Sequence, residues 1–557
     1  MSTLLPVPNE YLGFSAATGV ASWVFLNRRT VRGDYAFLFY SATCLSLYAL
    51  LRAYPLASAS PSIAAAYITF TYFTTLASVT VGYRLSPWHP LASYPGPVLW
   101  RISSVYLTYV SFMGRRHLIL DKLHAKYGPF LRIGPNTLSL NTPAATSVYL
   151  NMEKSEAYRF PAHDDVVGIF FKQDTKEVHR ERKKLWGGMF TPNGLAQLTP
   201  ALEKRTWEVM RCIERRQKGN GGYVNLPEAF YHWSHDFMGD MVFSGCNKIE
   251  LMKNGDAKEL IYTGKLATVM QDSLGQSPWL MDILWQIPAT KDMHQLVRLA
   301  SQMTRTRVQA KELPAFRDLI SYLMEGGVSL PDMERDAVIG ILGGSDNTSI
   351  AMALCCYFLV AEPHYYVALR AELDAAFPDP LGHLAPATLA NLPLLNGAIH
   401  EVLRLGSPYF LPRVAGPGGA KINGRYIPEG TIVALAAYSQ QTSPDNFFPE
   451  PMNFRPERWQ PQGLGPDTKT NKAVLASFSF GPHSCIGKVL AWQELRYCLS
   501  RVVLAFDMEF QPGFDVQAFR DGILNMRTTL LEKDMFMKVS RRAGVDLDKV
   551  FATLESE

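Results

Sequence analysis

The chain has 557 residues, of which 47% are hydrophobic and 19% are charged, and its net charge is +5. The charged share lies below the ~25% of typical soluble domains, which favours a protein partly embedded in lipid. The seven cysteines show no C-x-x-C pair or framework spacing, so a reducing compartment suits them, and no basic run interleaved with aromatics indicates a nucleic-acid partner.

Three uncharged stretches open the chain, at residues 11–27, 35–51 and 53–83. A membrane-spanning helix needs about 20 apolar residues, so the third stretch is long enough and the other two are marginal. Gly and Ser residues dilute the first stretch most. We expect residues 1–86 to form a membrane anchor with up to three transmembrane helices, the alternative being one span plus helices that lie on the membrane.

Basic residues indicate how this anchor is oriented. Arg28, Arg29 and Arg32 separate the first two stretches, and Arg84 follows the third. The positive-inside rule therefore predicts a lumenal N-terminus and a cytosolic remainder. No basic residue precedes Arg28, so we expect no cleaved signal peptide.

A proline-rich strip at residues 87–97 follows the anchor, and proline makes such linkers semi-rigid. We expect it to be a hinge before a catalytic domain at residues 98–557. A helical pattern at 117–127 and extended pieces at 130–133 and 137–140 predict a small sheet beside a mainly helical body.

A long helix is predicted farther on. Ser329-Leu-Pro331-Asp332 is a helix-start signal, and the pattern continues to Glu362-Pro363. Midway stands Gly343-Gly344-Ser345-Asp346-Asn347-Thr348. Adjacent glycines are costly inside a helix unless something approaches the backbone closely, and a packing kink is the alternative explanation.

The next motifs lie between residues 400 and 460. Glu401 and Arg404 are three residues apart on one side of a helix with apolar neighbours, and Arg458 follows in the segment 454–459. Many such pairs are exposed and contribute little. Asn423-Gly424 is a hairpin signal between predicted strands.

The segment 478–487 reads Phe-Ser-Phe-Gly-Pro-His-Ser-Cys-Ile-Gly and precedes a run of apolar residues at helical spacing. Cys485 is thus predicted on a short loop before a helix, where N–H groups and the positive helix end stabilise a thiolate. Such a sulfur is a good iron ligand. An isolated cysteine is otherwise a small buried hydrophobe.

This segment resembles the haem-binding loop of the cytochrome P450 family, F-x-x-G-x-R-x-C-x-G. Phe478, Gly481, Cys485 and Gly487 match the fixed positions, and His483 replaces the arginine. The resemblance implies that Cys485 is the axial thiolate ligand of haem iron, which favours O–O cleavage. The arginine of the family pairs with a haem propionate, and whether His483 does so depends on its protonation.

The long helix resembles the oxygen-binding groove of the family, A/G-G-x-D/E-T-T, in which an acid and an alcohol relay protons. Asp346 is the acid, whereas Asn347 stands at the first threonine and Thr348 follows. Either Thr348 substitutes for that threonine or the substrate supplies a hydroxyl.

Other residues match further parts of the family pattern. Glu401, Arg404 and Arg458 match a buried network that holds the cysteine loop in place. His179 and Lys183 stand where the family often carries W-x-x-x-R, two propionate donors, although a solvated helix face is the alternative. The resemblance also implies that Arg413 is a propionate ligand, that residues 407–411 line the substrate pocket, and that a loop at 522–526 closes it.

The resemblance implies a mainly α fold with small β-sheets, preceded by N-terminal transmembrane helices. It implies a haem-thiolate monooxygenase that oxidises a lipophilic substrate with NADPH electrons from NADPH–cytochrome P450 reductase, with cytochrome b5 as a further partner. Similarity to fungal microsomal members favours the endoplasmic reticulum membrane, a cytosolic catalytic domain and a terpenoid-like secondary metabolite.

Two alternatives stay open. Asn347 motivates the first, a haem-thiolate isomerase, dehydratase or peroxygenase that needs no external electrons. The second is a non-enzymatic haem-binding membrane protein, which would leave the Gly-Gly-x-Asp of the long helix unexplained.

Overall fold

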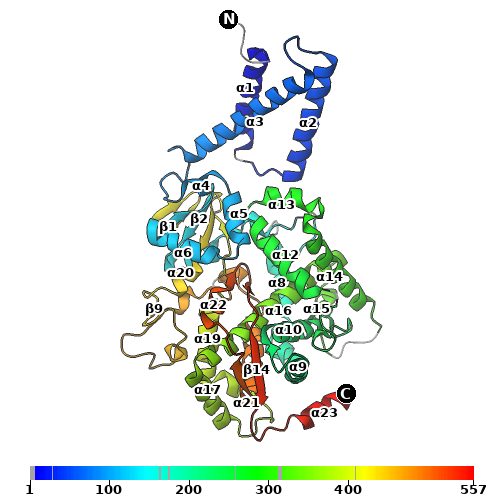
Figure 1. Ribbon diagram of the computed structural model, residues 1–557, viewed down its shortest axis with the longest axis vertical. Helices are drawn as coiled ribbons and strands as arrows, with labels where there is room; N and C mark the ends of the chain where they lie inside the picture. Colours follow the sequence, from blue (N-terminus) through cyan, green and yellow to red (C-terminus); the bar gives the residue numbers. More distant parts are fainter. Residues whose placement is uncertain are drawn as a thin grey trace.

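A computed structural model describes residues 7–27, 29–161, 165–172, 176–257, 259–311, 316–407 and 409–556. Two residues with an expected role lie outside these ranges: Arg28, expected in a basic loop, and Pro408, expected in the pocket wall. The described chain is mainly helical with small sheets, as predicted (Figure 1).

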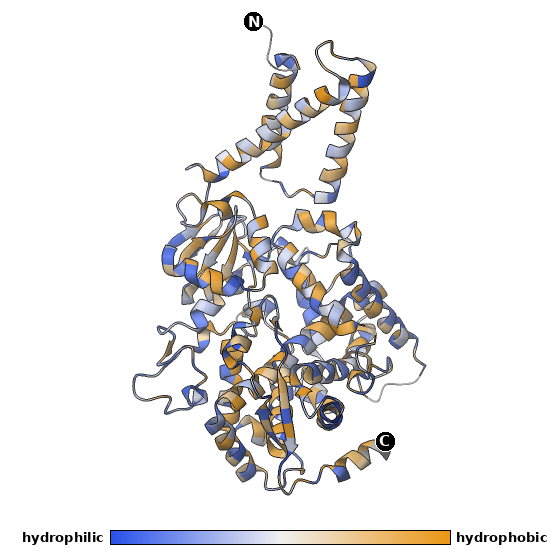
Figure 2. Cartoon of the chain, viewed as in Figure 1, coloured by the Kyte–Doolittle hydropathy of each residue, from blue (hydrophilic) through white to orange (hydrophobic). Residues whose placement is uncertain are grey.

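Three helices project from one end of the molecule: α1 (Asn9–Leu26), α2 (Gly33–Ala53) and α3 (Pro61–Leu85) (Figure 1). Helices α2 and α3 are long and apolar enough to cross a membrane and are hardly buried by the protein. Many of their residues are apolar (Figure 2). These helices indicate membrane association.

Helix α1 packs along α3 through its small residues. Ser15 and Gly19 are its buried positions, and Ser15 Oγ donates a hydrogen bond to the Ile68 carbonyl at 2.7 Å. Tyr72 Oη donates to Ser22 Oγ at 2.8 Å. The residues that dilute the hydrophobicity of α1 are thus its contact face, since small residues let membrane helices approach closely.

The main helical body follows the proline-rich strip. Its helices up to the long one are α4 (Val98–Ile102), α5 (Val105–Phe112), α6 (Arg116–Tyr127), α7 (Ser147–Asn151), α8 (Lys176–Gly187), α9 (Pro192–Gly219), α10 (Leu226–Phe243), α11 (Leu251–Asn254), α12 (Leu260–Leu274), α13 (Pro278–Trp285), α14 (Lys291–Gln309), α15 (Leu319–Glu325) and α16 (Leu330–Ala361). Those that follow are α17 (Pro363–Ala376), α18 (Pro386–Ala390), α19 (Pro393–Gly406), α20 (Ala437–Gln441), α21 (Lys488–Ala505), α22 (Val516–Asp521) and α23 (Asp548–Ser556).

The strands form small sheets. One has the order β1-β2-β8-β5-β3, a second β11-β14-β4, and three strand pairs are β6-β7, β9-β10 and β12-β13. Their bounds are β1 (Phe130–Arg132), β2 (Thr137–Leu140), β3 (Glu153–Lys154), β4 (Val224–Asn225), β5 (Arg413–Val414), β6 (Ala420–Ile422), β7 (Arg425–Ile427), β8 (Ile432–Leu435), β9 (Phe447–Phe448), β10 (Lys469–Thr470), β11 (Phe506–Phe510), β12 (Ile523–Asn525), β13 (Thr529–Leu531) and β14 (Phe536–Arg541).

Several local predictions are confirmed. The extended pieces are β1 and β2, and the helical pattern before them is α6. Asn423 and Gly424 both adopt positive φ and join β6 to β7. Both central residues of a type I′ hairpin turn need such angles.

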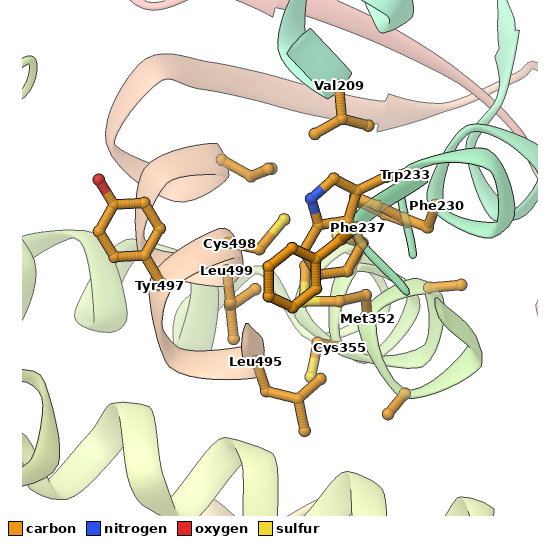
Figure 3. Close-up of a cluster of buried hydrophobic side chains, with 14 of the residues drawn as sticks. Val209, Phe230, Trp233, Phe237, Met352, Cys355, Leu495, Tyr497, Cys498 and Leu499 are labelled. Atoms are coloured by element: carbon orange, nitrogen blue, oxygen red, sulfur yellow. The ribbon is translucent and has the colours of Figure 1, made fainter. Parts of the chain in front are cut away.

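The long helix α16 is the axis of the core. Ser329 caps it by accepting a hydrogen bond from the Asp332 N–H. Although α16 is apolar and long enough to cross a membrane, 72% of its apolar window is buried inside the protein. Figure 3 shows Met352 and Cys355 of α16 packed with Trp233 of α10 and Cys498 of α21. α16 is therefore a core helix.

Candidate haem-thiolate site

Cys485 lies on a short loop between a 3₁₀ turn (Gly481–His483) and α21. Its N–H donates to the Phe478 carbonyl at 2.8 Å. Gly481 has a φ of 66°, and a Cβ there would lie 2.5 Å from the Tyr149 carbonyl oxygen. Only glycine fits this turn, which fixes the position of the cysteine.

The sulfur faces a cavity of about 280 Å³, called the cysteine cavity below. Cys485 and Phe478 line it together with Gly343 and Thr348 of α16. The thiol is exposed to this cavity and otherwise enclosed. Burial raises its pKa, which the Gly487 N–H and the Lys183 ammonium counteract.

Basic side chains from distant segments gather at the same cavity. Among the described residues, the basic side chains that line the cavity are Lys154, His179, Lys183, Arg413, His483 and Arg527. His483 Nδ1 lies 3.0 Å from His179 Nε2, and its Nε2 lies 3.4 Å from a Glu153 carboxylate oxygen. Arg413 Nη1 donates to the Tyr158 hydroxyl at 3.1 Å.

These basic groups shift one another's pKa values. Burial, and then the charge of Lys154, lower the pKa of His179 to about 4 and that of His483 to about 2. Burial also holds the pKa of Lys154 well below its ordinary value. An anion placed among these groups would relieve the repulsion.

This donor set fits haem. A cysteine sulfur can bind the iron, the basic groups can pair with two propionates, and the apolar side chains of Ala351, Leu403 and Leu490 fit a flat macrocycle. Arg413 is buried, and its Nε has no hydrogen-bond partner in the protein. A buried cationic donor of this kind suits a carboxylate.

Lys183 makes a contact that the sequence did not predict. Its Nζ donates to the carbonyls of Pro482 at 2.7 Å and Ser484 at 3.2 Å. The residue before the cysteine is therefore tied to α8. His179 lies on the same helix, so the pair stands together at the cavity as expected from the four-residue spacing.

The α16 motif presents its residues to different neighbours. Gly343, Gly344 and Thr348 all line the cysteine cavity. Gly344 also packs against Met238 of α10, where a Cβ would lie 2.1 Å from the sulfur. The glycine pair thus leaves space at the site, and Gly344 in addition serves helix packing.

Asn347 connects three segments. Its Oδ1 accepts hydrogen bonds from Tyr409 Oη at 2.9 Å and Thr528 Oγ1 at 2.8 Å, and its Nδ2 donates to the Gly343 carbonyl at 3.3 Å. We call these three side chains the Asn347 clasp. The amide is therefore occupied by protein partners.

Asp346 points away from the cysteine cavity, toward α10. Its Oδ1 lies 3.9 Å from His235 Nε2, and its Oδ2 has no hydrogen-bond partner in the protein. Complete burial raises the pKa of Asp346 to about 7, with Lys265 opposing the shift. Burial lowers the pKa of His235 to about 4.

Glu401, Arg404 and Arg458 form a buried network. Arg404 Nε and Nη2 donate to the two Glu401 oxygens at 2.5 and 2.9 Å, and Arg458 Nε donates to Oε1 at 3.3 Å. All three side chains have 0% exposure. Trp459 Nε1 also donates to Glu401, at 3.2 Å.

A chain of hydrogen bonds leads from this network to the cysteine loop. Gln441 Nε2 donates to the Arg404 carbonyl at 2.6 Å, and Gln441 Oε1 accepts from the Ala476 N–H at 2.9 Å. Ser477 Oγ donates to the Leu403 carbonyl at 2.8 Å. Residues 476–477 directly precede Phe478, so the network holds the start of the loop.

The segment 407–411 alternates between two environments. Tyr409 and Leu411 line the cysteine cavity, whereas Phe410 packs under the Arg116 guanidinium. The loop predicted at 522–526 is mostly strand β12. The residues that reach the cavities from this hairpin are its tip, Arg527 and Thr528, just beyond the predicted stretch.

A second cavity of about 140 Å³, called the side chamber, adjoins the first. Phe170, Ile339, Gly343, Asn347 and Arg527 line both. The other lining residues are mainly aromatic and aliphatic. Such a chamber suits an apolar ligand.

Sequence reasoning missed Lys154, Arg527, His235 and Glu494. Glu494 is buried, one carboxylate oxygen has no hydrogen-bond partner in the protein, and burial holds its pKa well above the ordinary value. An acid inside the apolar run after Cys485 was a usable signal. Lys154, Arg527 and His235 have no local signal, because distant segments bring them to the site.

Comparison with known proteins agrees with this geometry. Residues 94–531 match the family model "Cytochrome P450". The chain is 29% identical to "Cytochrome P450 67" of Uromyces fabae, covering 94% of this chain and 99% of that protein. It is 29% identical to "Tryprostatin B 6-hydroxylase" of Neosartorya fischeri (80% and 81% covered) and 30% identical to "Averantin hydroxylase" of Dothistroma septosporum (77% and 82% covered).

The family model spans most of the catalytic body, including the cysteine loop, the α16 motif and the Glu401 network. The helical fold with small sheets is the fold of that family, and haem-thiolate is its cofactor. The chain belongs to the cytochrome P450 family and is a monooxygenase of that family.

Proposed function

We propose that this enzyme inserts one oxygen atom from O2 into a lipophilic substrate and reduces the other to water. NADPH supplies the electrons through NADPH–cytochrome P450 reductase, and cytochrome b5 is a second candidate donor. The observation that carries this proposal is the arrangement of Cys485 in a cation-rich cavity that adjoins an apolar chamber.

Cys485 would bind the haem iron, and Arg413, Lys154, His179 and His483 would surround the propionates. Phe478, Gly481 and Gly487 shape the loop, and Lys183 holds it. Thiolate-bound haem supplies oxygen activation. Thr348, which lines the cysteine cavity, and Asp346, which lines the side chamber instead, would deliver protons from α16. The Asn347 clasp would keep α16 in place beside the chamber.

Residues 1–86 would anchor the enzyme in the endoplasmic reticulum membrane with its catalytic domain, residues 98–557, in the cytosol. α1, α2 and α3 alternate in direction, as three consecutive spans would (Figure 1), and α2 and α3 are long and apolar enough to cross a membrane. The proposed lumenal N-terminus rests on the distribution of basic residues. The strip 87–97 would act as the hinge. Tyr94 Oη donates to the Tyr426 carbonyl at 2.6 Å, which supports a set angle between anchor and body.

The substrate is proposed to be a secondary metabolite of terpenoid-like, lipophilic character. The apolar side chamber supports the lipophilic class. Two relatives are named as hydroxylases of small molecules, tryprostatin B and averantin, which supports hydroxylation as the reaction.

The test uses the full-length enzyme in membranes with the reductase. We expect a thiolate-type carbon monoxide difference spectrum, and substrate-dependent NADPH consumption matched by product, with the products of neighbouring biosynthetic genes as trial substrates. Conversion of a substrate that does not depend on NADPH and reductase would contradict the proposed electron supply.

A second candidate is a haem-thiolate isomerase, dehydratase or peroxygenase. It is favoured by the Asn347 clasp, in which the amide at the usual threonine position is already hydrogen-bonded to protein. This candidate predicts product without NADPH and reductase.

A further inference from the structure

Arg527 is a buried cation at the junction of the two cavities. Its side chain is 5% exposed, and it lines both the cysteine cavity and the side chamber. It stands at the tip of the β12–β13 hairpin, next to Thr528 of the Asn347 clasp. A ligand in the side chamber therefore meets its guanidinium.

The guanidinium is only partly satisfied by the protein. Nη2 donates to the Ala157 carbonyl, and the group lies 4.3 Å from the centre of the Tyr158 ring. Nε lies 3.6 Å from an Asp272 oxygen, beyond hydrogen-bond distance. Nε and Nη1 have no hydrogen-bond partner in the protein. Two buried N–H-bearing atoms of Arg527 therefore lack an acceptor in the protein.

The charge of Arg527 is also incompletely balanced. Asp272 pairs with Arg116, whose Nη1 lies 3.0 Å from its other oxygen, and both side chains are fully buried. One carboxylate thus faces two guanidinium groups. A buried charge without a full counter-charge is expensive, so an anion at Arg527 would be bound strongly.

Haem propionates do not need this group. Arg413 and Lys154 are buried on strands β5 and β3, which pair side by side through these two residues, and both line the cysteine cavity but not the side chamber. Two propionates can pair with these two cations. Arg527 is the cation that reaches into the chamber.

The rest of the side chamber defines the remainder of the ligand. Among the described residues, the apolar side chains that line this chamber include Phe160, Phe171, Met293, Leu296 and Val338. Arg527 is the cationic side chain among the described lining residues. Asp346 is the carboxyl group there. An apolar chamber with one cationic donor matches a hydrocarbon body with one anionic end.

We propose that Arg527 binds the carboxylate of a lipophilic carboxylic acid substrate whose hydrocarbon part occupies the side chamber. This inference rests on the proposed function, because it assigns a substrate class to the same site. The guanidinium fork and a carboxylate form charge-assisted hydrogen bonds in the low-dielectric interior.

The experiment measures ligand dissociation constants from the shift of the Soret band. The haem-loaded full-length enzyme is titrated with decanoic acid, decanol and methyl decanoate, which share one hydrocarbon chain. Wild type should prefer the acid. Arg527→Gln should weaken acid binding about ten- to hundredfold, the range for a lost hydrogen bond to a charged group, and leave decanol binding unchanged. Arg527→Lys should retain part of the preference.

Arg413→Gln is the matched control on the same cavity wall. It should lower haem content and keep the preference for the acid, whereas Arg527→Gln should keep haem content. Any of three results would overturn the inference. These are equal weakening of acid binding and decanol binding by Arg527→Gln, no preference for the acid in wild type, and a haem loss in Arg527→Gln as large as in Arg413→Gln. A missing thiolate carbon monoxide spectrum in wild type would instead contradict the proposed function, and the same samples show which has failed.

Discussion

Cys485 is positioned by backbone contacts on both sides of the loop. The Phe478 carbonyl accepts its N–H, Gly481 allows the turn, and Lys183 binds the carbonyls of the residues around it. Replacing the sulfur should therefore remove the iron ligand while leaving the loop in shape. Neither serine nor alanine supplies a comparable soft anionic donor.

Cys485→Ser is expected to abolish the thiolate-type carbon monoxide spectrum and all NADPH-dependent turnover. The measurement is the reduced difference spectrum of membranes with equal protein content. Cys246→Ser is the control, because Cys246 is half-buried and lies outside both cavities. A red-shifted Soret band in the Cys485 variant would disprove the ligand assignment.

Asp346 lowers the stability of the protein near neutral pH and has a proposed role in catalysis. Its folded pKa is about 7 instead of 3.8, so the stability it contributes is present below about pH 4 and is lost as the pH rises toward 7. Each pKa unit corresponds to about 1.4 kcal/mol. Asp346→Asn should therefore raise the melting temperature more at about pH 8 than at about pH 5.

The same variant should lower the ratio of product to NADPH and raise hydrogen peroxide, because α16 loses its proton donor. Thr348→Val should show the same loss of coupling without the gain in stability. If Asp346→Asn keeps full coupling, protons reach the site by another route. A melting temperature that moves equally at both pH values would mean that Asp346 is not buried as a neutral acid.

At the scale of elements, α16 is joined to two other segments by the Asn347 clasp. Asn347→Ala would leave the Tyr409 and Thr528 hydroxyls without their acceptor, and each buried unsatisfied donor costs about 1–3 kcal/mol. We therefore expect the free energy of unfolding to fall by about 1–3 kcal/mol for each of the two hydroxyls. Denaturant unfolding of the haem-loaded enzyme measures this loss. Adding Tyr409→Phe to Asn347→Ala removes one of the two unpaired hydroxyls and should restore part of the lost stability. Strictly additive effects of the two substitutions would contradict the clasp.

A second prediction at this scale concerns the Glu401 network. Glu401→Gln leaves two buried guanidinium groups without their counter-charge, which costs about 3–5 kcal/mol. Arg404→Lys keeps the charge but loses the two-point contact with the Glu401 carboxylate. Both should lower haem content and folded yield. Glu325→Gln removes an exposed partner of Arg317 and should change little. Normal haem content in both network variants would contradict the role in holding the loop.

Local motifs were predictable because their residues lie close in the sequence. The turn at Asn423-Gly424, the helix start at Ser329 and the three-residue spacing of Glu401 and Arg404 depend on short-range geometry. Arg527 and Lys154 were not predictable in this way. They lie 373 residues apart (527 − 154), and only the tertiary fold brings them to one cavity.

At the scale of the whole molecule, the N-terminal helices contact the rest of the protein at a second place besides the strip 87–97. The Gly33 N–H at the start of α2 donates to Asp282 of α13 at 2.9 Å, and Gln286 Nε2 donates to Asp34 at 3.4 Å. The strip 87–97, the proposed hinge, follows α3, and this contact holds α2. Together they restrain how the body sits beside the membrane.

The last prediction concerns α1, which packs against α3 and which we propose to span the membrane with its help. A Cβ at Gly19 would lie 3.0 Å from the Tyr72 carbonyl oxygen and 3.2 Å from Thr75 Cβ, whereas Gly13 has nothing within 4 Å. Gly19→Leu and Gly13→Leu add the same hydrophobicity, so their difference isolates packing. With an N-glycosylation acceptor at the N-terminus, wild type and Gly13→Leu should be glycosylated and Gly19→Leu much less.

Thr69→Cys supplies a check on the remaining anchor, since Thr69 Oγ1 lies 4.0 Å from Cys44 Sγ and a disulfide would join α2 to α3. This cross-link should form equally in all three backgrounds, because neither glycine lies at that contact. Equal glycosylation of both leucine variants would show that α1 spans the membrane without help from α3. Absence of glycosylation in wild type as well would place α1 on the cytosolic surface and leave α2 and α3 as the spans, which reverses the expected lumenal N-terminus.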